Sequence, residues 1–406
     1  GMYVSRLDKP WIEPPFTLEG MAIKTKNDIE ILRRYTSYVY VDTDQGSTPD
    51  PKHWISISPN KLSLEGDEQA PVIAFKKPKN NEYTKLRRAF YEIETEFEEE
   101  LKVAKEVKIR LEKDLKKVLV DITKGDELDI NLLKQGIEAS VASILRNPSA
   151  FSLLAQLEKS DEYSYSHALS TSIWCAQFGR HLGLEKSDIE LLALGGMLLD
   201  IGKLQLPPKL LHSTAPLTPE ENIAMQQHVD QSVRILAKSK TVPAKILRMV
   251  ATHHERSDTS GYPNALPNKE IPIFGRIAGI VDSYDAMTTS RPYNTKPYSP
   301  NDAINELYVL RDKTFQPELI EQFIQTVGLY PTGSLVELNS GAVAVVLEVN
   351  DLKRLYPTIM LILNSDKIPL EEFITIDLST EKTAGLKVEK ALPTGAYGIQ
   401  LDQLFL

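Results

Sequence analysis

The chain has a single cysteine, Cys175, among its 406 residues. One cysteine excludes an intramolecular disulfide and is typical of a reducing compartment. Cys175 falls within an apolar helical pattern, so packing is its expected role. No apolar run approaches the roughly eighteen residues that a membrane-spanning helix needs, and the beginning of the chain lacks the basic and apolar regions of a signal peptide. A cytoplasmic protein without a membrane span is therefore expected.

An excess of basic residues is also missing. Lysine and arginine number 47 against 56 acidic residues, which gives a formal net charge of −9. A general nucleic-acid binder usually presents a basic face, so DNA and long RNA are not expected as partners. A small anionic ligand is not excluded, because local cations or bound metal ions can reverse the sign of the potential inside a cleft.

Residues 82–120 contain neither glycine nor proline and are rich in glutamate and lysine. Apolar residues such as Phe97, Leu101 and Ala104 recur there at helical spacing, which predicts a long amphipathic helix. Two interpretations stay open. The helix is either a solvated connection between domains, or it pairs with another domain or with a copy of itself in a homodimer.

A chain of this length exceeds one ordinary core, so two or three domains are expected. The fold class is predicted to be mainly α, with a small α+β domain before the helices and a β-rich module after them. Strands are indicated in that last module at 335–338, 342–349 and 358–363, where β-branched residues alternate with turns. The expected divisions are 1–80 (small α+β domain), 81–125 (connecting helix), 126–330 (helical domain) and 331–406 (β-rich module).

Histidines are few and unevenly placed. Of the seven in the chain, four are His167, His228, His253 and His254. The last two are adjacent and precede the turn Gly261-Tyr262-Pro263. Two neighbouring imidazoles beside a Gly–Pro turn are hard to explain by core packing, whereas imidazole is the commonest nitrogen ligand for a metal in proteins.

Two carboxylates, Asp200 and Asp282, occur in apolar helical segments, where a buried charge is costly without compensation. A metal ion would compensate Asp200, and so would a salt bridge to Lys203, which is the favoured interpretation of Asp200 taken alone. His167 shares a helical face with Trp174 and therefore points into the bundle. Each residue alone is a weak signal. Together they direct nitrogen and oxygen ligands from different helices at one core, a mixture that suits Fe, Mn, Zn or Ni better than Mg.

Several motifs together resemble the HD-GYP phosphodiesterases over about 150–330. They are Leu199-Asp200-Ile201-Gly202-Lys203, His228, His253-His254-Glu255-Arg256, Gly261-Tyr262-Pro263, Asp282-Ser283-Tyr284-Asp285-Ala286-Met287-Thr288 and Ser290-Arg291-Pro292-Tyr293. Residues 1–41 resemble the small accessory domain that often precedes this family's catalytic domain in bacterial proteins. The resemblance implies an all-helical HD bundle that cleaves cyclic dinucleotides, chiefly cyclic di-GMP, at a site of two or three metal ions.

The resemblance also implies roles for particular residues. Asp200 would be the bridging carboxylate, Lys203 would contact the scissile phosphate, and Arg291 would contact a substrate phosphate, with Tyr262 beside the bound substrate. Two divalent ions are expected, with Fe, Mn or Ni as the candidates. The implied metal ligands are His167, Asp200, His228, His253, His254 and Asp282.

This chain departs from the family pattern at three positions. Leu199 stands where the signature histidine is expected, and His181 and His212 are the spare histidines of the region. Tyr163 stands where members with three ions carry glutamate, which favours two ions. Asn294 replaces a residue that is usually basic, and Lys296 lies nearby.

We therefore expect a phosphodiesterase acting on cyclic di-GMP or 3′,3′-cyclic GMP-AMP. The alternatives are a receptor that binds the dinucleotide without cleaving it, because of Leu199, and a scaffold that assembles through 82–120. A scaffold has no need of Asp200, Lys203, His253 and Asp282, so their presence disfavours the last alternative.

Overall fold

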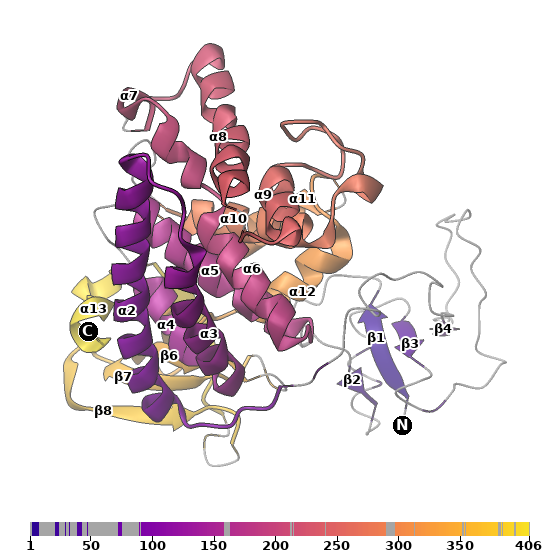
Figure 1. Cartoon of the computed structure of the whole chain (residues 1–406). Helices are drawn as coiled ribbons and strands as arrows, with labels where there is room; N and C mark the ends of the chain where they lie inside the picture. Colours follow the sequence, from indigo (N-terminus) through magenta and orange to yellow (C-terminus); the bar gives the residue numbers. More distant parts are fainter. Residues whose placement is uncertain are drawn as a thin grey trace. The chain divides into compact units, whose positions relative to one another are not determined.

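The computed structural model in Figure 1 divides the chain into two compact units, Gly1–Thr84 with Asn350–Leu355, and Lys85–Val349 with Tyr356–Leu406. The residues that it describes are 2–7, 21–23, 29, 32, 39–42, 47, 72–74, 89, 91–157, 163–211, 213, 215–239, 241–289, 297–311, 313–350, 353, 355–380, 383, 385–393 and 395–405.

The first unit contains a small four-stranded sheet. Its strands have the order β2-β1-β3-β4, with β3 antiparallel to β1 and parallel to β4. Val4 and Val41 are buried beneath it. Between β2 and β3 the structure describes Ile29 and Leu32, both helical. The strands are β1 (Tyr3–Leu7), β2 (Met21–Ala22), β3 (Val39–Asp42) and β4 (Val72–Ala74).

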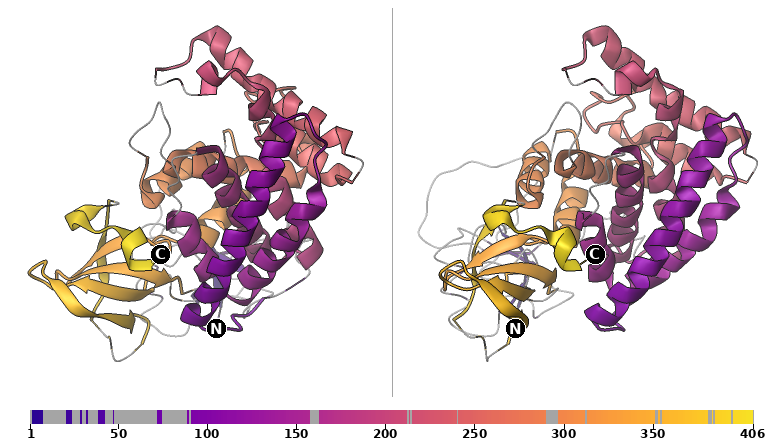
Figure 2. Two further views of the ribbon diagram at one scale, coloured as in Figure 1. Left: turned by 60° about the vertical axis from the view of Figure 1, so that its left-hand side comes forward. Right: turned by 90° about the vertical axis from the view of Figure 1, so that its left-hand side faces the viewer.

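The second unit is dominated by helices, which confirms the predicted fold class. Figures 1 and 2 show them as a bundle with a sheet at one end. The helices are α2 (Phe97–Thr123), α3 (Ile130–Arg146), α4 (Pro148–Leu157), α5 (Tyr163–His181), α6 (Lys186–Leu198), η2 (Ile201–Gln205), α7 (Pro208–Leu211), α8 (Pro219–Lys238), α9 (Ala244–Thr252), η3 (Asn268–Glu270), α10 (Ile273–Thr288), α11 (Pro300–Leu310) and α12 (Pro317–Val327).

Helix α2 starts at Phe97, later than the expected position near 82. The described residues just before it are not helical, because tertiary hydrogen bonds override their helical propensity. The Ala89 amide donates to the Gly183 carbonyl (3.0 Å), and the Glu94 amide donates to the Arg146 carbonyl (2.9 Å). The apolar stripe of α2 packs on α3 and α4, so the face expected to form a homodimer is occupied within the chain.

Helices α5, α6 and α10 form the centre of the bundle. Trp174 of α5 meets Tyr284 of α10 edge to face, with ring centroids 5.4 Å apart, and Phe323 of α12 joins the same cluster. Helix α6 approaches α9 closely at Gly195, where a Cβ atom would lie 2.5 Å from the sulfur of Met249. Cys175 is buried on α5 as predicted, and burial raises the pKa of its thiol.

The chain ends in a five-stranded antiparallel sheet, β8-β7-β6-β5-β9, which confirms the predicted β-rich module. Its central strand β6 contributes apolar residues to both faces, with Val346 on one and Val345 on the other. Short helix α13 (Leu401–Phe405) packs on the second face (Figure 2). The strands are β5 (Leu335–Leu338), β6 (Val343–Glu348), β7 (Thr358–Leu363), β8 (Pro369–Asp377) and β9 (Val388–Leu392).

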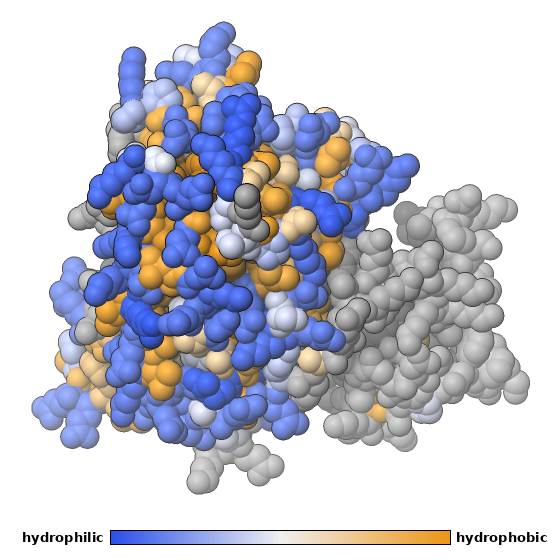
Figure 3. Space-filling model, viewed as in Figure 1, coloured by the Kyte–Doolittle hydropathy of each residue, from blue (hydrophilic) through white to orange (hydrophobic). Residues whose placement is uncertain are grey.

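The surface of the bundle mixes hydrophilic and apolar residues on the face drawn in Figure 3. Single apolar residues on a surface are normal, because a folded chain has too little polar surface to cover itself. Among the described helices, none is both long enough and apolar enough to cross a membrane.

Candidate metal centre

Six side chains expected as metal ligands converge in the centre of the bundle. They form two groups of neighbouring ligand atoms, in each of which the atoms lie within 4.8 Å of one another, and Asp200 belongs to both. We call the first the imidazole-rich side and the second the carboxylate-rich side. The imidazole-rich side contains Asp200, His228, His253 and His254, and the carboxylate-rich side contains His167, Asp200 and Asp282.

The six ligands come from five parts of the helical framework. His167 lies in the second turn of α5, and Asp200 caps η2 directly after α6. His228 lies in the middle of α8. His253 and His254 follow α9, and Asp282 lies on α10. The centre therefore requires five helical segments to pack together, which no local stretch of sequence provides.

Asp200 turns one carboxylate oxygen toward each side. Its Oδ1 lies 3.2 Å from Nε2 of His228 and 3.9 Å from Nε2 of His253. Its Oδ2 lies 3.1 Å from Nε2 of His167 and also accepts a hydrogen bond from Nζ of Lys203. A carboxylate in this orientation can bridge two cations.

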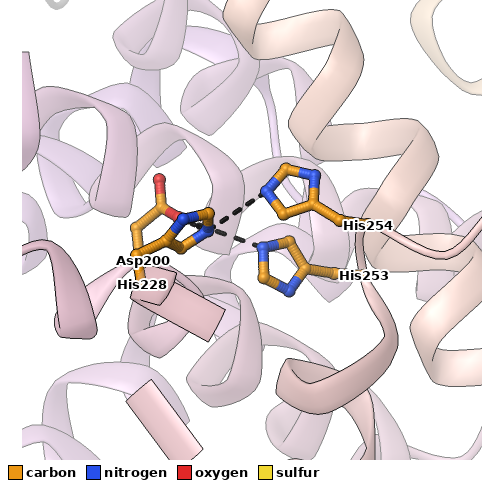
Figure 4. A group of neighbouring side chains, drawn as sticks. All are labelled: Asp200, His228, His253 and His254. Carbon is orange, nitrogen blue, oxygen red and sulfur yellow. Dashed lines mark hydrogen bonds and ion pairs between the residues drawn. The ribbon is translucent and has the colours of Figure 1, made fainter. Parts of the chain in front are cut away.

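The two sides also meet at His254. Its Nε2 lies 3.2 Å from Nε2 of His228, and its Nδ1 lies 3.8 Å from Oδ2 of Asp282. Figure 4 marks the contact between His254 and His228 with a dashed line. The other oxygen of Asp282, Oδ1, lies 3.2 Å from Nε2 of His167. The six side chains thus form one continuous cluster rather than two separate sites.

Three of the histidines have their second ring nitrogen fixed. Nδ1 of His228 lies 2.8 Å from the Met225 carbonyl, and Nδ1 of His253 lies 2.7 Å from the Val250 carbonyl. A carbonyl only accepts, so each Nδ1 carries the proton and leaves the Nε2 lone pair toward the cluster. This support of the outer nitrogen is the usual arrangement around histidines that bind metals.

Asp285 supports the third histidine, and sequence reasoning had assigned it no role. Its Oδ2 lies 2.6 Å from Nδ1 of His167, and its Oδ1 accepts a hydrogen bond from Ser170. Asp285 is 2% exposed and lies three residues after Asp282 on α10. A second carboxylate on the same helical face as a suspected ligand was the available signal.

Burial and neighbouring charges fix the ionisation of the cluster. Burial lowers the pKa of His253 to about 4, and it also holds the pKa of His254 well below its usual value, so both imidazoles are neutral near pH 7. Burial raises the pKa of Asp200, but the neighbouring Lys203 ammonium outweighs it, and the pKa lies well below the usual range. Neutral imidazoles and ionised carboxylates are the forms that bind cations.

Unsatisfied polar atoms test whether a metal fits. Among the residues that the structure describes, Oδ1 of Asp200 and Nε2 of His253 are fully buried and make no hydrogen bond. Burying such atoms without a partner costs about 1–3 kcal/mol each, and more for a charged group. Both atoms point into the cluster, and their chemistry is that of metal ligands, so the residues fit divalent cations.

The position of Asp200 depends on close packing between η2 and α8. A Cβ atom at Gly202 would lie 2.1 Å from the His228 carbonyl oxygen, so only glycine permits this approach. The Gly202 amide donates to Oγ of Ser232 (2.8 Å), which in turn donates to the Leu199 carbonyl (2.9 Å). Helix α8 is capped by Thr218, which forms a reciprocal capping box with Glu221.

The Gly-Tyr-Pro turn is bound to the paired histidines. The carboxylate of Glu255, 4% exposed, accepts from the amides of Asn264 and Leu266, both at 2.8 Å. The ring of Tyr262 stacks on His254, with centroids 4.5 Å apart and an interplanar angle of 24°. Tyr262 is therefore placed directly beside the cluster, as expected.

Other expected site residues have different outcomes. Lys203 lies in the metal centre, where it donates to Asp200. Leu199, the residue directly before Asp200, is buried, with 1% of its surface exposed. His181 lies at the opposite end of α5 from His167, where its Nε2 is 3.1 Å from Gln322, so it does not replace a ligand at this cluster. The structure describes no side chain for Tyr163, and four further positions lie outside the described residues: His212, Arg291, Asn294 and Lys296.

Comparison with known proteins identifies two regions. Residues 150–319 match the family model described as an HD domain, and residues 1–133 match a domain of unknown function, DUF3391. Cyclic di-GMP phosphodiesterase PA4108 of Pseudomonas aeruginosa is 28% identical over 96% of this chain and 90% of its own length.

Two further relatives match a smaller part of the chain. The 3′3′-cGAMP-specific phosphodiesterase 2 of Vibrio cholerae is 32% identical over 43% of this chain and 34% of its own length. A cyclic di-GMP phosphodiesterase of Thermotoga maritima is 35% identical over 43% of this chain and 49% of its own length. The motifs, the helical bundle and these matches agree: the chain contains an HD domain over 150–319, and its first part matches DUF3391.

Proposed function

We propose that the protein hydrolyses cyclic dinucleotides to linear dinucleotides at this centre. The observation that carries the proposal is Asp200, whose two oxygens face two groups of ligands while Lys203 lies beside it. Relatives that carry the name cyclic di-GMP phosphodiesterase and others named for 3′3′-cGAMP support the substrate class. Cyclic di-GMP and 3′,3′-cyclic GMP-AMP are the two candidate substrates.

Divalent ions bound here would lower the pKa of a water molecule and neutralise charge on a phosphate. The residues of the chain do the rest. The Lys203 ammonium is positioned to stabilise negative charge that develops on the phosphoryl oxygens, in a largely buried setting where such stabilisation is strong. The imidazoles of His228 and His253 are held by their Nδ1 atoms, so that their Nε2 atoms face the cluster.

Substrate binding is proposed for two further residues. The Tyr262 ring lies on His254 beside the cluster and offers an aromatic surface for a nucleobase. Arg291 is proposed to contact a phosphate of the substrate, as the resemblance implies, because a guanidinium can form two hydrogen bonds to a phosphate. Together they would orient an anion within an acidic chain.

The alternative function is a receptor that binds the dinucleotide without hydrolysis, and Leu199 is the observation that favours it. Leucine has no ligand atom, so one of the two ions would lack a nitrogen ligand that the family pattern supplies. Hydrolysis is preferred, because every other ligand expected from the family pattern lies in the cluster with its supporting hydrogen bonds.

One experiment separates the two functions. The purified full chain is loaded with Mn²⁺ or Fe²⁺ and incubated with each cyclic dinucleotide, and products are separated by chromatography. The expected result is a linear dinucleotide that the Asp200→Ala variant does not form. Binding of the dinucleotide without any product under either metal would establish the receptor and exclude the enzyme.

The assembly and the location of the protein stay predictions. A homodimer through 82–120 would need a surface of α2 other than its apolar stripe, which packs on α3 and α4. Sedimentation of the full chain tests that prediction. The cytoplasmic location rests on the sequence alone.

A further inference from the structure

We propose that the two cations of this centre are held unequally. The imidazole-rich side binds one ion tightly, and the carboxylate-rich side binds the other loosely enough to exchange. The inference rests on the metal centre proposed above and concerns the ligands of this particular chain. It would make the second ion, rather than the first, the one whose supply limits activity.

The number and the kind of ligand differ between the sides. The imidazole-rich side offers three imidazoles and one carboxylate oxygen, whereas the carboxylate-rich side offers the single imidazole of His167 and oxygens of Asp200 and Asp282. Leu199, buried and directly before Asp200, adds nothing to either. With Asp200 shared, one side has three ligands of its own and the other has two.

Lys203 widens this difference. Its ammonium donates to Oδ2 of Asp200, the same oxygen that lies 3.1 Å from His167. A positive charge bound to that oxygen competes with a cation on the carboxylate-rich side. Oδ1, which faces His228 and His253, makes no hydrogen bond within the described part of the chain and is left for a cation.

The hydrogen bonds that support the outer ring nitrogens of the histidines reduce the difference in affinity between the two sides only in part. Asp285 makes the His167 imidazole more basic and so a better ligand. The imidazole-rich side has two supports of its own, the carbonyls of Met225 and Val250. Ligand number, charge and supporting hydrogen bonds together therefore still predict tighter cation binding on the imidazole-rich side.

The kinds of ligand predict different ions on the two sides. Imidazole nitrogens suit Fe, Ni or Zn, and carboxylate oxygens suit Mn or Mg. A tightly bound ion of the first kind should survive purification on the imidazole-rich side. The carboxylate-rich side should take up Mn²⁺ from solution.

The test is a titration of the metal-free full chain with Mn²⁺, in which electron paramagnetic resonance measures the unbound ion. We expect two bound ions per chain in two classes, with dissociation constants that differ about tenfold or more. Loss of one hydrogen bond to a ligating histidine already weakens metal binding by about 10–100-fold, so a difference of this size is expected. His167→Ala should remove the weak class and keep the tight class. His253→Ala should weaken the tight class.

Two further variants serve as controls for the titration. His181→Ala changes a histidine on the same helix as His167 but at its opposite end, and both classes should persist. Asp282→Asn acts on the carboxylate-rich side without a cavity, which matters if His167→Ala fails to fold by circular dichroism. Two sites of equal affinity, or loss of the tight class in Asp282→Asn, would overturn the inference. Such a result leaves the proposed hydrolysis standing, whereas a chain that binds neither Mn²⁺ nor Fe²⁺ refutes both.

Discussion

The two sides of the metal centre are built in different ways. On the imidazole-rich side, His228 and His253 take the support of their outer nitrogens from carbonyls three residues earlier in the chain. On the carboxylate-rich side, His167 takes it from Asp285, which is 118 residues away in sequence. One side is thus oriented by local helical geometry, and the other by the packing of α5 against α10.

This contrast has a consequence for substitutions. A local support persists as long as the helix persists, so it has no side chain that a mutation could remove. A support from a distant carboxylate depends on one residue and on the contact between two helices. The carboxylate-rich side should therefore respond to more substitutions than the imidazole-rich side, and Asp200 alone should affect both.

The largest effect is expected at Asp200, since it is the one ligand that the two sides share. Asp200→Ala should abolish detectable binding of both ions and all hydrolysis, as measured by metal analysis of the dialysed protein and by chromatography of the products. Asp230→Ala is a suitable control, because Asp230 is exposed on α8. Retention of two ions by Asp200→Ala would refute the bridging role.

A large effect on turnover, but not on metal content, is expected at Lys203. Lys203→Met keeps the length of the side chain and removes the charge beside Oδ2 of Asp200. The value of kcat should fall by about 10²–10³-fold, the usual loss when one stabilising donor is removed. Mn²⁺ affinity on the carboxylate-rich side should stay the same or rise, because a competing cation is gone. A loss of Mn²⁺ with unchanged kcat would reverse the assignment.

The same contrast explains how much could be predicted from the sequence. The motifs placed all six ligand candidates in one bundle, since their order and spacing are specific to the family. Asp285 was quoted in a motif but received no role, because the contact that gives it one joins helices distant in sequence. The beginning of α2 was also misjudged, since hydrogen bonds such as that of Ala89 to Gly183 are tertiary and leave no local pattern.

A moderate effect is expected at Asp285, confined to one side. Asp285→Asn preserves size but lacks the charge that holds the proton on Nδ1 of His167, so it should weaken the loosely bound Mn²⁺ by about 10–100-fold. The tight class should be unchanged in the same titration. Asp302→Asn, an exposed position on α11, provides the control. Equal weakening of both classes would indicate a structural defect rather than the loss of a support.

The smallest expected effect is a gain. Leu199→His places an imidazole directly before the shared Asp200, where the family pattern has one. If the loose binding on the carboxylate-rich side comes from the missing ligand, this variant should tighten the weak Mn²⁺ class about tenfold, an effect similar to that of a hydrogen bond to a ligating histidine. The difference in affinity between the two classes should then decrease. Leu199→Met, which keeps the volume and adds no imidazole, should leave both constants unchanged. If the two variants behave alike, the asymmetry does not come from residue 199, and it rests on the unequal number of imidazoles and on the Lys203 ammonium bound to Oδ2 of Asp200.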